Sequence, residues 1–186
     1  MVDWMIEVLS NFKCEDQTFF IAATLLDRFF AKIKTAQGVA DLHLLGVTAM
    51  WVSSKFTDIQ PLKMKMVFEK IAHKKLSIEL IKQTELKYMT VLDYKLAAPT
   101  ILDFLRVYLR AILKIENQPH MEPMKVLLQK MSLYLSKMAV HDYYLSGLLP
   151  SLVAIACFYV SLKISEQLKK SQLINQQIVQ DMQKYS

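Results

Sequence analysis

Histidine and glycine, on which most metal-binding and phosphate-binding motifs depend, are few and scattered in this chain. The four histidines, at positions 43, 73, 120 and 141, include no pair at the spacing of zinc ligands. The three glycines, at positions 38, 46 and 147, cannot form a glycine-rich phosphate loop. His141 and Asp142 adjoin, but neighbours on a helix point in different directions and no nucleophile is evident beside them. We therefore predict a protein that is not an enzyme and holds no metal or cofactor.

Two charged residues in the predicted helices, Lys55 and Glu85, carry no functional signal on their own. Lys55 lies near the end of the apolar segment 42–56, and Glu85 lies within a second segment of helical periodicity, 77–92. A lysine at the C-terminal end of a helix is favoured by the helix dipole, so Lys55 alone would be an ordinary end charge. Glu85 alone would be an ordinary surface carboxylate. Any joint role depends on the helices that hold them.

Apolar residues recur at helical spacing along almost the whole chain. Turn residues are scarce, with 3 glycines and 5 prolines among 186 residues, so we predict an all-α protein. The helices expected in the first half cover residues 2–12, 17–31, 41–56, 62–71 and 77–92. Those expected in the second half cover residues 101–115, 122–139, 144–165 and 172–185.

The expected helices divide into two groups. Segment 42–56 is apolar or small on nearly every side, which is typical of the central helix of a bundle. Pro99 disfavours helix and Thr100 can cap a new one, so we predict domains at 1–96 and 97–186. Residues 159–163 (YVSLK) resemble residues 51–55 (WVSSK) at a spacing of 108 residues, which suggests a duplicated bundle.

Composition narrows the class of protein further. The net charge of +6 has the sign required for nucleic acid, but the lysines are dispersed in small groups, as on ordinary solvated surfaces. Cys14 and Cys157 lie far apart, and we expect reduced thiols inside a cell. No signal peptide is evident. The longest apolar run, 148–164, includes Pro150 and Lys163 and is shorter than a usual membrane span, so we expect a buried helix and no membrane segment.

Four segments, in order, resemble the cyclin family and specifically its mitotic A- and B-type branch. They are Val2-Asp3-Trp4-Met5-Ile6-Glu7-Val8, Leu26-Asp27-Arg28-Phe29, Leu45-Gly46-Val47-Thr48-Ala49-Met50 with Ser54-Lys55-Phe56, and Leu96-Ala97-Ala98-Pro99-Thr100. The second half is similar only in its apolar pattern and in residues 148–151. The resemblance implies a cyclin-like fold of two tandem five-helix-type bundles. We leave open whether the second is complete, because one amphipathic helix follows its central helix where a full bundle of the family has two.

The resemblance also implies a function. Cyclins bind a cyclin-dependent protein kinase, act in cell-cycle control in the nucleus and cytoplasm, and activate the kinase allosterically by holding its regulatory helix inward. The kinase contact pair of the family corresponds to Lys55 and Glu85. The positions where the family has apolar kinase contacts are occupied here by Phe56, Met89, Tyr94 and Leu96.

Two further sites follow from the resemblance. Many cyclins dock substrates or inhibitors carrying an arginine-x-leucine motif, and Trp4, Glu7 and Leu42 match that groove, although Trp4 as plain core is the alternative. His43 stands where a glutamine is usual. Asp27 is expected to be a structural buried charge, because its neighbours are apolar. In cyclins its partner is an arginine just before the position of Val2, so we expect that segment to precede Met1, the alternative being a divergent cyclin.

The sequence departs from the family beside the proposed contact lysine. Ser53 replaces a usual alanine, and Thr57 with Asp58 replaces two glutamates, so the choice of kinase is open. Cyclin-like bundles also occur in general transcription factors that bind DNA, and we keep nucleic-acid binding as the alternative function. A scaffold of helical bundles without a kinase partner is a third interpretation.

Overall fold

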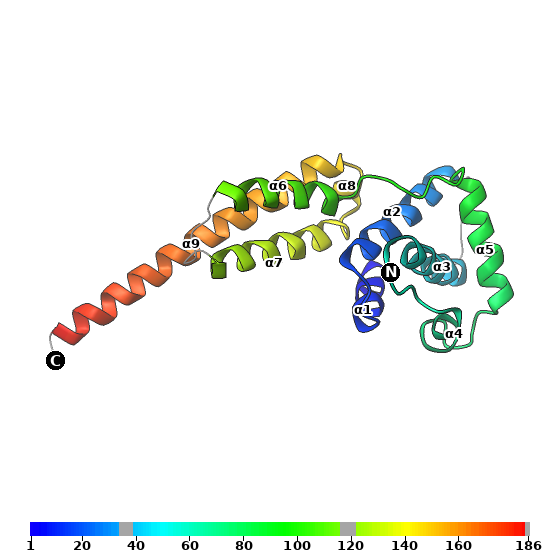
Figure 1. Cartoon of the computed structure of the whole chain (residues 1–186), viewed down its shortest axis with the longest axis horizontal. Helices are drawn as coiled ribbons and strands as arrows, with labels where there is room; N and C mark the ends of the chain where they lie inside the picture. Colours follow the sequence, from blue (N-terminus) through cyan, green and yellow to red (C-terminus); the bar gives the residue numbers. More distant parts are fainter. Residues whose placement is uncertain (34–38, 116–121, 185–186) are drawn as a thin grey trace. The chain divides into compact units, whose positions relative to one another are not determined.

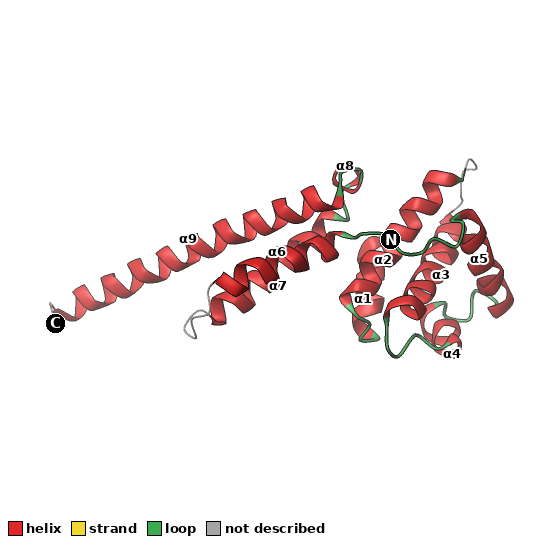
Figure 2. Ribbon diagram, turned by 45° about the horizontal axis from the view of Figure 1, so that its top comes forward, coloured by secondary structure: helices red, strands yellow, loops and turns green. Residues whose placement is uncertain are grey.

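The computed structural model describes residues 1–33, 39–115 and 122–184. All regular structure in these ranges is helical (Figure 2), which confirms the prediction of an all-α protein. The chain forms two compact units, Met1–Thr100 and Ile101–Ser186.

Unit 1 is built around one central helix. Its elements are α1 (Val2–Asn11), α2 (Asp16–Lys32), α3 (Val39–Thr57), α4 (Met64–Met66), the π-helical turn η1 (Val67–Ile71) and α5 (Ile78–Val91). Helix α3 contacts α1, α2, η1 and α5, and the other helices surround it in Figure 1. The prediction of a central helix is therefore confirmed.

The burial of α3 follows from its small and apolar residues. Val47, Ala49, Met50 and Val52 are all buried, as expected for a helix with neighbours on several sides. At Gly46, a Cβ atom would lie 2.8 Å from the Met1 sulfur and 3.4 Å from the Trp4 ring. The missing side chain therefore allows α1 to approach α3 closely.

Polar contacts between distant residues fix both ends of α3. Near the N-terminal end, the buried Tyr88 hydroxyl of α5 donates to the Leu45 carbonyl at 3.1 Å. Just after the C-terminal end, one carboxylate oxygen of Asp58 accepts from the Glu15 backbone N–H at 2.9 Å and from the Thr18 hydroxyl at 2.6 Å. Asp58 therefore ties the N-terminus of α2 to the end of α3, 43 residues away along the chain.

The helix predicted over residues 62–71 begins two residues later, at Met64, and continues as a π turn. The backbone of Leu62 has other partners. Its N–H donates to the Ser54 hydroxyl at 2.8 Å, and its carbonyl accepts from the Trp51 indole at 3.1 Å. Since these contacts tie Leu62 to α3, the residue does not start the next helix.

Unit 2 contains α6 (Ile101–Ile115), α7 (Glu122–Ala139), the short α8 (Tyr143–Ser146) and α9 (Pro150–Lys184). Helices α6 and α7 both pack against α9. The prediction of two helices at 144–165 and 172–185 is wrong. A short helix ends before Gly147, and a single helix then runs from Pro150 to Lys184. Pro150 suits the first position of a helix, and residues 165–172 (SEQLKKSQ) include neither Gly nor Pro to end it.

The first half of α9 is apolar. By length and composition alone, Pro150–Leu168 could cross a membrane, although 33% of the stretch is already buried inside unit 2. The buried side chains include Val153, Ala154 and Phe158. Core helices pass the same test of length and composition.

Candidate functional site

Lys55 and Glu85 form an ion pair between two helices that are not consecutive in the chain. Lys55 lies in the last turn of α3 and Glu85 lies within α5. The lysine ammonium donates to the Glu85 carboxylate and also lies 3.5 Å from the centroid of the Trp51 ring, one turn earlier on α3. The side chains are 35% and 20% exposed, so both charged groups are still accessible to a partner.

Apolar side chains lie next in sequence and one turn away from this pair. Phe56, directly after Lys55, is 50% exposed, which is unusual for a phenylalanine. Met89 follows Glu85 by four residues on α5, hence on the same side of that helix, and is half-buried. A charged pair with accessible apolar neighbours is typical of a protein interaction surface.

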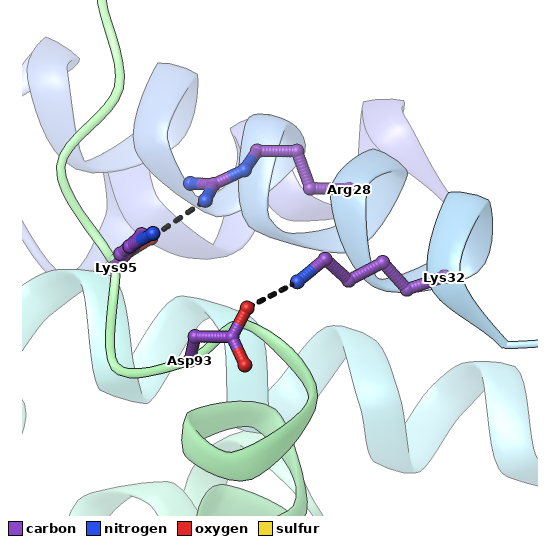
Figure 3. Close-up of polar contacts among 4 residues, drawn as sticks. All are labelled: Arg28, Lys32, Asp93 and Lys95. Atoms are coloured by element: carbon purple, nitrogen blue, oxygen red, sulfur yellow. Dashed lines mark hydrogen bonds and ion pairs between the residues drawn. The ribbon is translucent and has the colours of Figure 1, made fainter.

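Tyr94 and Leu96 lie on the segment that follows α5. Tyr94 is 69% exposed and Leu96 is half-buried. Two residues of α2 hold this segment (Figure 3): Arg28 Nη2 donates to the Lys95 carbonyl at 2.7 Å, and Lys32 Nζ pairs with Asp93 at 2.7 Å. The hydrogen bond from Lys32, together with the lysine charge, lowers the pKa of the Asp93 carboxyl.

The groove residues predicted on α1 and α3 are only partly brought together. Trp4 is half-buried and its ring lies 5.1 Å from that of His43. Glu7, three residues after Trp4 on the same helix, is exposed, and Leu42, next to His43, is half-buried. Partial burial lowers the pKa of His43, with further contributions from Lys75 and His73.

The role of Asp27 as a structural buried charge stays a prediction. Its residue surface is exposed, and it has no hydrogen bond or ion pair among the described residues. Its apolar sequence neighbours, such as Leu26 and Phe29, face the core from other sides of α2. The surrounding protein nevertheless removes enough water to raise the pKa of the Asp27 carboxyl. The pKa of Tyr88 is raised by burial and, secondarily, by the Asp27 charge.

The remaining reactive groups do not assemble into a chemical centre in the described parts of the chain. No group of three or more His, Cys, Asp or Glu side chains there could hold a metal ion. Both cysteines are free thiols. Burial, reinforced by the charge of Asp58, raises the pKa of Cys14 to about 12, so its thiol is a poor nucleophile at neutral pH.

Sequence reasoning overlooked three contributors to the site. Trp51 could have been found, because an aromatic residue four positions before a lysine lies on the same side of a helix. Arg28 and Lys32 carried no such signal, since their partners lie 67 and 61 residues away.

The arrangement defines a class: two tandem helical units, the first of which presents an ion pair and apolar side chains on its surface. Residues 1–97 match the family described as "Cyclin, N-terminal domain", and residues 99–186 match "Cyclin, C-terminal domain". This chain belongs to the cyclin family. The predicted cyclin resemblance and the cyclin-like fold of two tandem domains are thereby confirmed.

Named relatives and a solved structure agree with this membership. The chain is 32% identical over 164 residues to G2/mitotic-specific cyclin-B of Hydra viridissima, covering 88% of this chain and 38% of the relative. It is 29% identical over 162 residues to Cyclin-A2 of Xenopus laevis, covering 87% and 36%. The chain thus spans about two fifths of these relatives. A viral cyclin from herpesvirus saimiri has the same fold, with a TM-score of 0.74 at 18% identity, covering 88% of this chain and 67% of that one.

Proposed function

We propose that this chain is a regulatory subunit that binds a cyclin-dependent protein serine/threonine kinase and activates it allosterically in cell-cycle control, without chemistry of its own. The observation that carries the proposal is the Lys55–Glu85 pair, held between α3 and α5, with the exposed Phe56 next to Lys55 in the sequence. The mitotic names of relatives support the same assignment.

The pair is suited to orient a partner because its charges are already in place. Trp51 supports the Lys55 ammonium from one side and Glu85 fixes it from another, so little side-chain freedom remains to be lost on binding. Lys55 keeps further N–H groups that can donate to partner carbonyls, and Glu85 keeps a second oxygen that can accept from partner N–H groups. Phe56 and Met89 would supply buried apolar area. A kinase helix held there would bring its glutamate to the lysine that binds ATP phosphates.

The decisive experiment mixes the chain with candidate cyclin-dependent kinases and measures phosphorylation of a basic peptide. We expect stimulation by the wild-type chain and its loss in Lys55→Glu and Glu85→Lys. The matched control is Lys163→Glu, because Lys163 pairs with Glu166 and lies over Tyr159 in unit 2. This control should stimulate normally.

Two results would contradict the proposal in different ways. A wild-type chain that stimulates none of the kinases, even when extended at its N-terminus, would exclude the activating role. Charge-reversed variants that stimulate fully would instead remove Lys55 and Glu85 from the interface. Circular dichroism of each variant checks that helicity is unchanged.

We further propose that Trp4, Glu7 and Leu42 form a docking site for substrates or inhibitors with an arginine-x-leucine motif. The half-buried ring of Trp4 and the exposed carboxylate of Glu7 support it, since they suit an apolar and a basic side chain respectively. Fluorescence titration with such a peptide should show saturable binding that Glu7→Lys abolishes, and no binding would overturn the site.

We also expect the chain in the nucleus and cytoplasm, which imaging of a tagged chain checks.

A further inference from the structure

The segment after α5 is anchored to α2 by polar contacts from three α2 residues. Lys32 Nζ pairs with the Asp93 carboxylate at 2.7 Å, and Arg28 Nη2 donates to the Lys95 carbonyl at 2.7 Å (Figure 3). Further along, Gln17 Nε2 donates to the Thr100 hydroxyl at 3.1 Å. These contacts span residues 93–100, so α2 supports almost the whole segment.

The part held by Arg28 and Lys32 has a strained backbone. Asp93 and Tyr94 have φ angles of 52° and 56°, in the left-handed region that disfavours residues with a Cβ atom. The Tyr94 N–H donates to the Met89 carbonyl at 2.8 Å, which closes the turn against the end of α5. Two consecutive left-handed residues without glycine persist when their surroundings hold them.

We infer that Arg28 and Lys32 are positioning residues that hold the Asp93–Tyr94 turn, and through it Tyr94 and Leu96, in the geometry that a kinase contacts. This inference rests on the proposed function. The turn presents Tyr94 with 69% of its surface exposed, although the backbone beneath it is fixed. A large aromatic side chain on a fixed backbone loses little freedom on binding and is a typical interface anchor.

Because the Lys32–Asp93 ion pair is exposed, its effect on the position of the turn can be measured without a large change in the stability of unit 1. The Lys32 and Asp93 side chains are 46% and 65% exposed, so breaking their contact should affect the unfolding of unit 1 very little. Arg28 is half-buried and its Nη1 is buried without an acceptor among the described residues, so its removal could disturb folding. Lys32 is therefore the better probe, and Arg28→Lys serves as a second.

The first test uses the free chain and measures amide hydrogen exchange. Replacing Lys32 with Met should speed exchange at the Tyr94 and Leu96 amides by roughly 2- to 5-fold, the range expected for loss of an exposed pair. The matched control, Lys163→Met, removes the exposed pair with Glu166 and should leave these amides unchanged. Equal exchange in wild type and Lys32→Met would overturn the positioning role.

The second test titrates a kinase that the wild-type chain stimulates. Lys32→Asp should raise the chain concentration needed for half-maximal stimulation several-fold, while maximal stimulation stays at the wild-type level. The double variant Lys32→Asp with Asp93→Lys should restore the wild-type concentration, because it rebuilds the pair with the charges exchanged. A general loss of folding would lower thermal stability in both variants and would not be rescued.

The outcomes distinguish the two proposals. If the wild-type chain stimulates the kinase and Lys32→Asp does so at the same concentration, the positioning role is wrong and the proposed function stands. If the wild-type chain stimulates no kinase, the proposed function fails, and the positioning role fails with it. Rescue by the exchanged pair, with unchanged maximal stimulation, supports both.

Discussion

Residues 51–55 and 159–163 have related sequences but different surroundings. In both, a lysine lies over the aromatic ring four residues earlier, at 3.5 Å from the Trp51 centroid for Lys55 and at 5.6 Å from the Tyr159 centroid for Lys163. Trp51, however, is 8% exposed and Tyr159 is 58% exposed. The local geometry is repeated, whereas the burial is not.

The acidic partners differ in the same way. Glu85 reaches Lys55 from another helix, 30 residues along the chain, whereas Glu166 follows Lys163 by three residues on α9. In unit 1 the lysine and the aromatic ring therefore form part of a contact between two helices. In unit 2 the same two residue types lie on the surface of a single helix. A lysine and an aromatic residue four positions apart are therefore not enough to form the site, which also requires a carboxylate from a second helix.

The largest expected difference concerns the two aromatic residues. Trp51→Ala should lower the free energy of unfolding by about 3–5 kcal/mol, because it removes a buried ring and its 3.1 Å hydrogen bond to the Leu62 carbonyl. Tyr159→Ala should cost less than about 1 kcal/mol, since the ring is mostly exposed. Urea denaturation followed by circular dichroism measures both. Similar losses at the two positions would contradict the comparison.

The serines two residues after each aromatic residue should respond with opposite signs. Ser53 is fully buried and its hydroxyl has no partner among the described residues, so Ser53→Ala should stabilise the chain by about 1 kcal/mol. Ser161 is equally buried but donates to the Cys157 carbonyl at 2.8 Å, so Ser161→Ala should be destabilising by about 0.5 kcal/mol. The same denaturation experiment applies, and a loss of stability in Ser53→Ala would show that its hydroxyl has a partner after all.

Local sequence predicted what depends on local forces. The helices followed from periodicity, and the lysine over an aromatic ring could have been derived from a spacing of four. The start of the helix after Leu62 could not be predicted in this way. The backbone of Leu62 is hydrogen-bonded to the side chains of Ser54 and Trp51, and no local sequence pattern indicates these contacts. The length of α9 was also mispredicted, because the segment predicted to separate two helices contains no residue that ends a helix.

The site residues also differ in how far the sequence could predict them. Lys55 and Glu85 were paired by family resemblance, since their separate sequence contexts describe only an end charge and a surface carboxylate. The structure then brings their charged groups together. The buried charge predicted at Asp27 rested on apolar sequence neighbours, which lie on other sides of the helix. The anchoring by Arg28 joins residues 67 apart and required the fold to be known.

The smallest expected difference concerns the two ion pairs and requires double-mutant cycles. The coupling between Lys55 and Glu85 should be about 0.5–1 kcal/mol, because their side chains are 35% and 20% exposed and Trp51 shields the ammonium. Lys163 and Glu166, at 53% and 59% exposure, should couple by about 0.2–0.5 kcal/mol and lose more of it in high salt. Equal couplings would mean that the second helix adds nothing to the stability of the first pair. Even the larger value is too small for loss of the pair alone to unfold unit 1, so a charge-reversed variant that keeps its helicity but not its kinase stimulation reports on binding rather than folding.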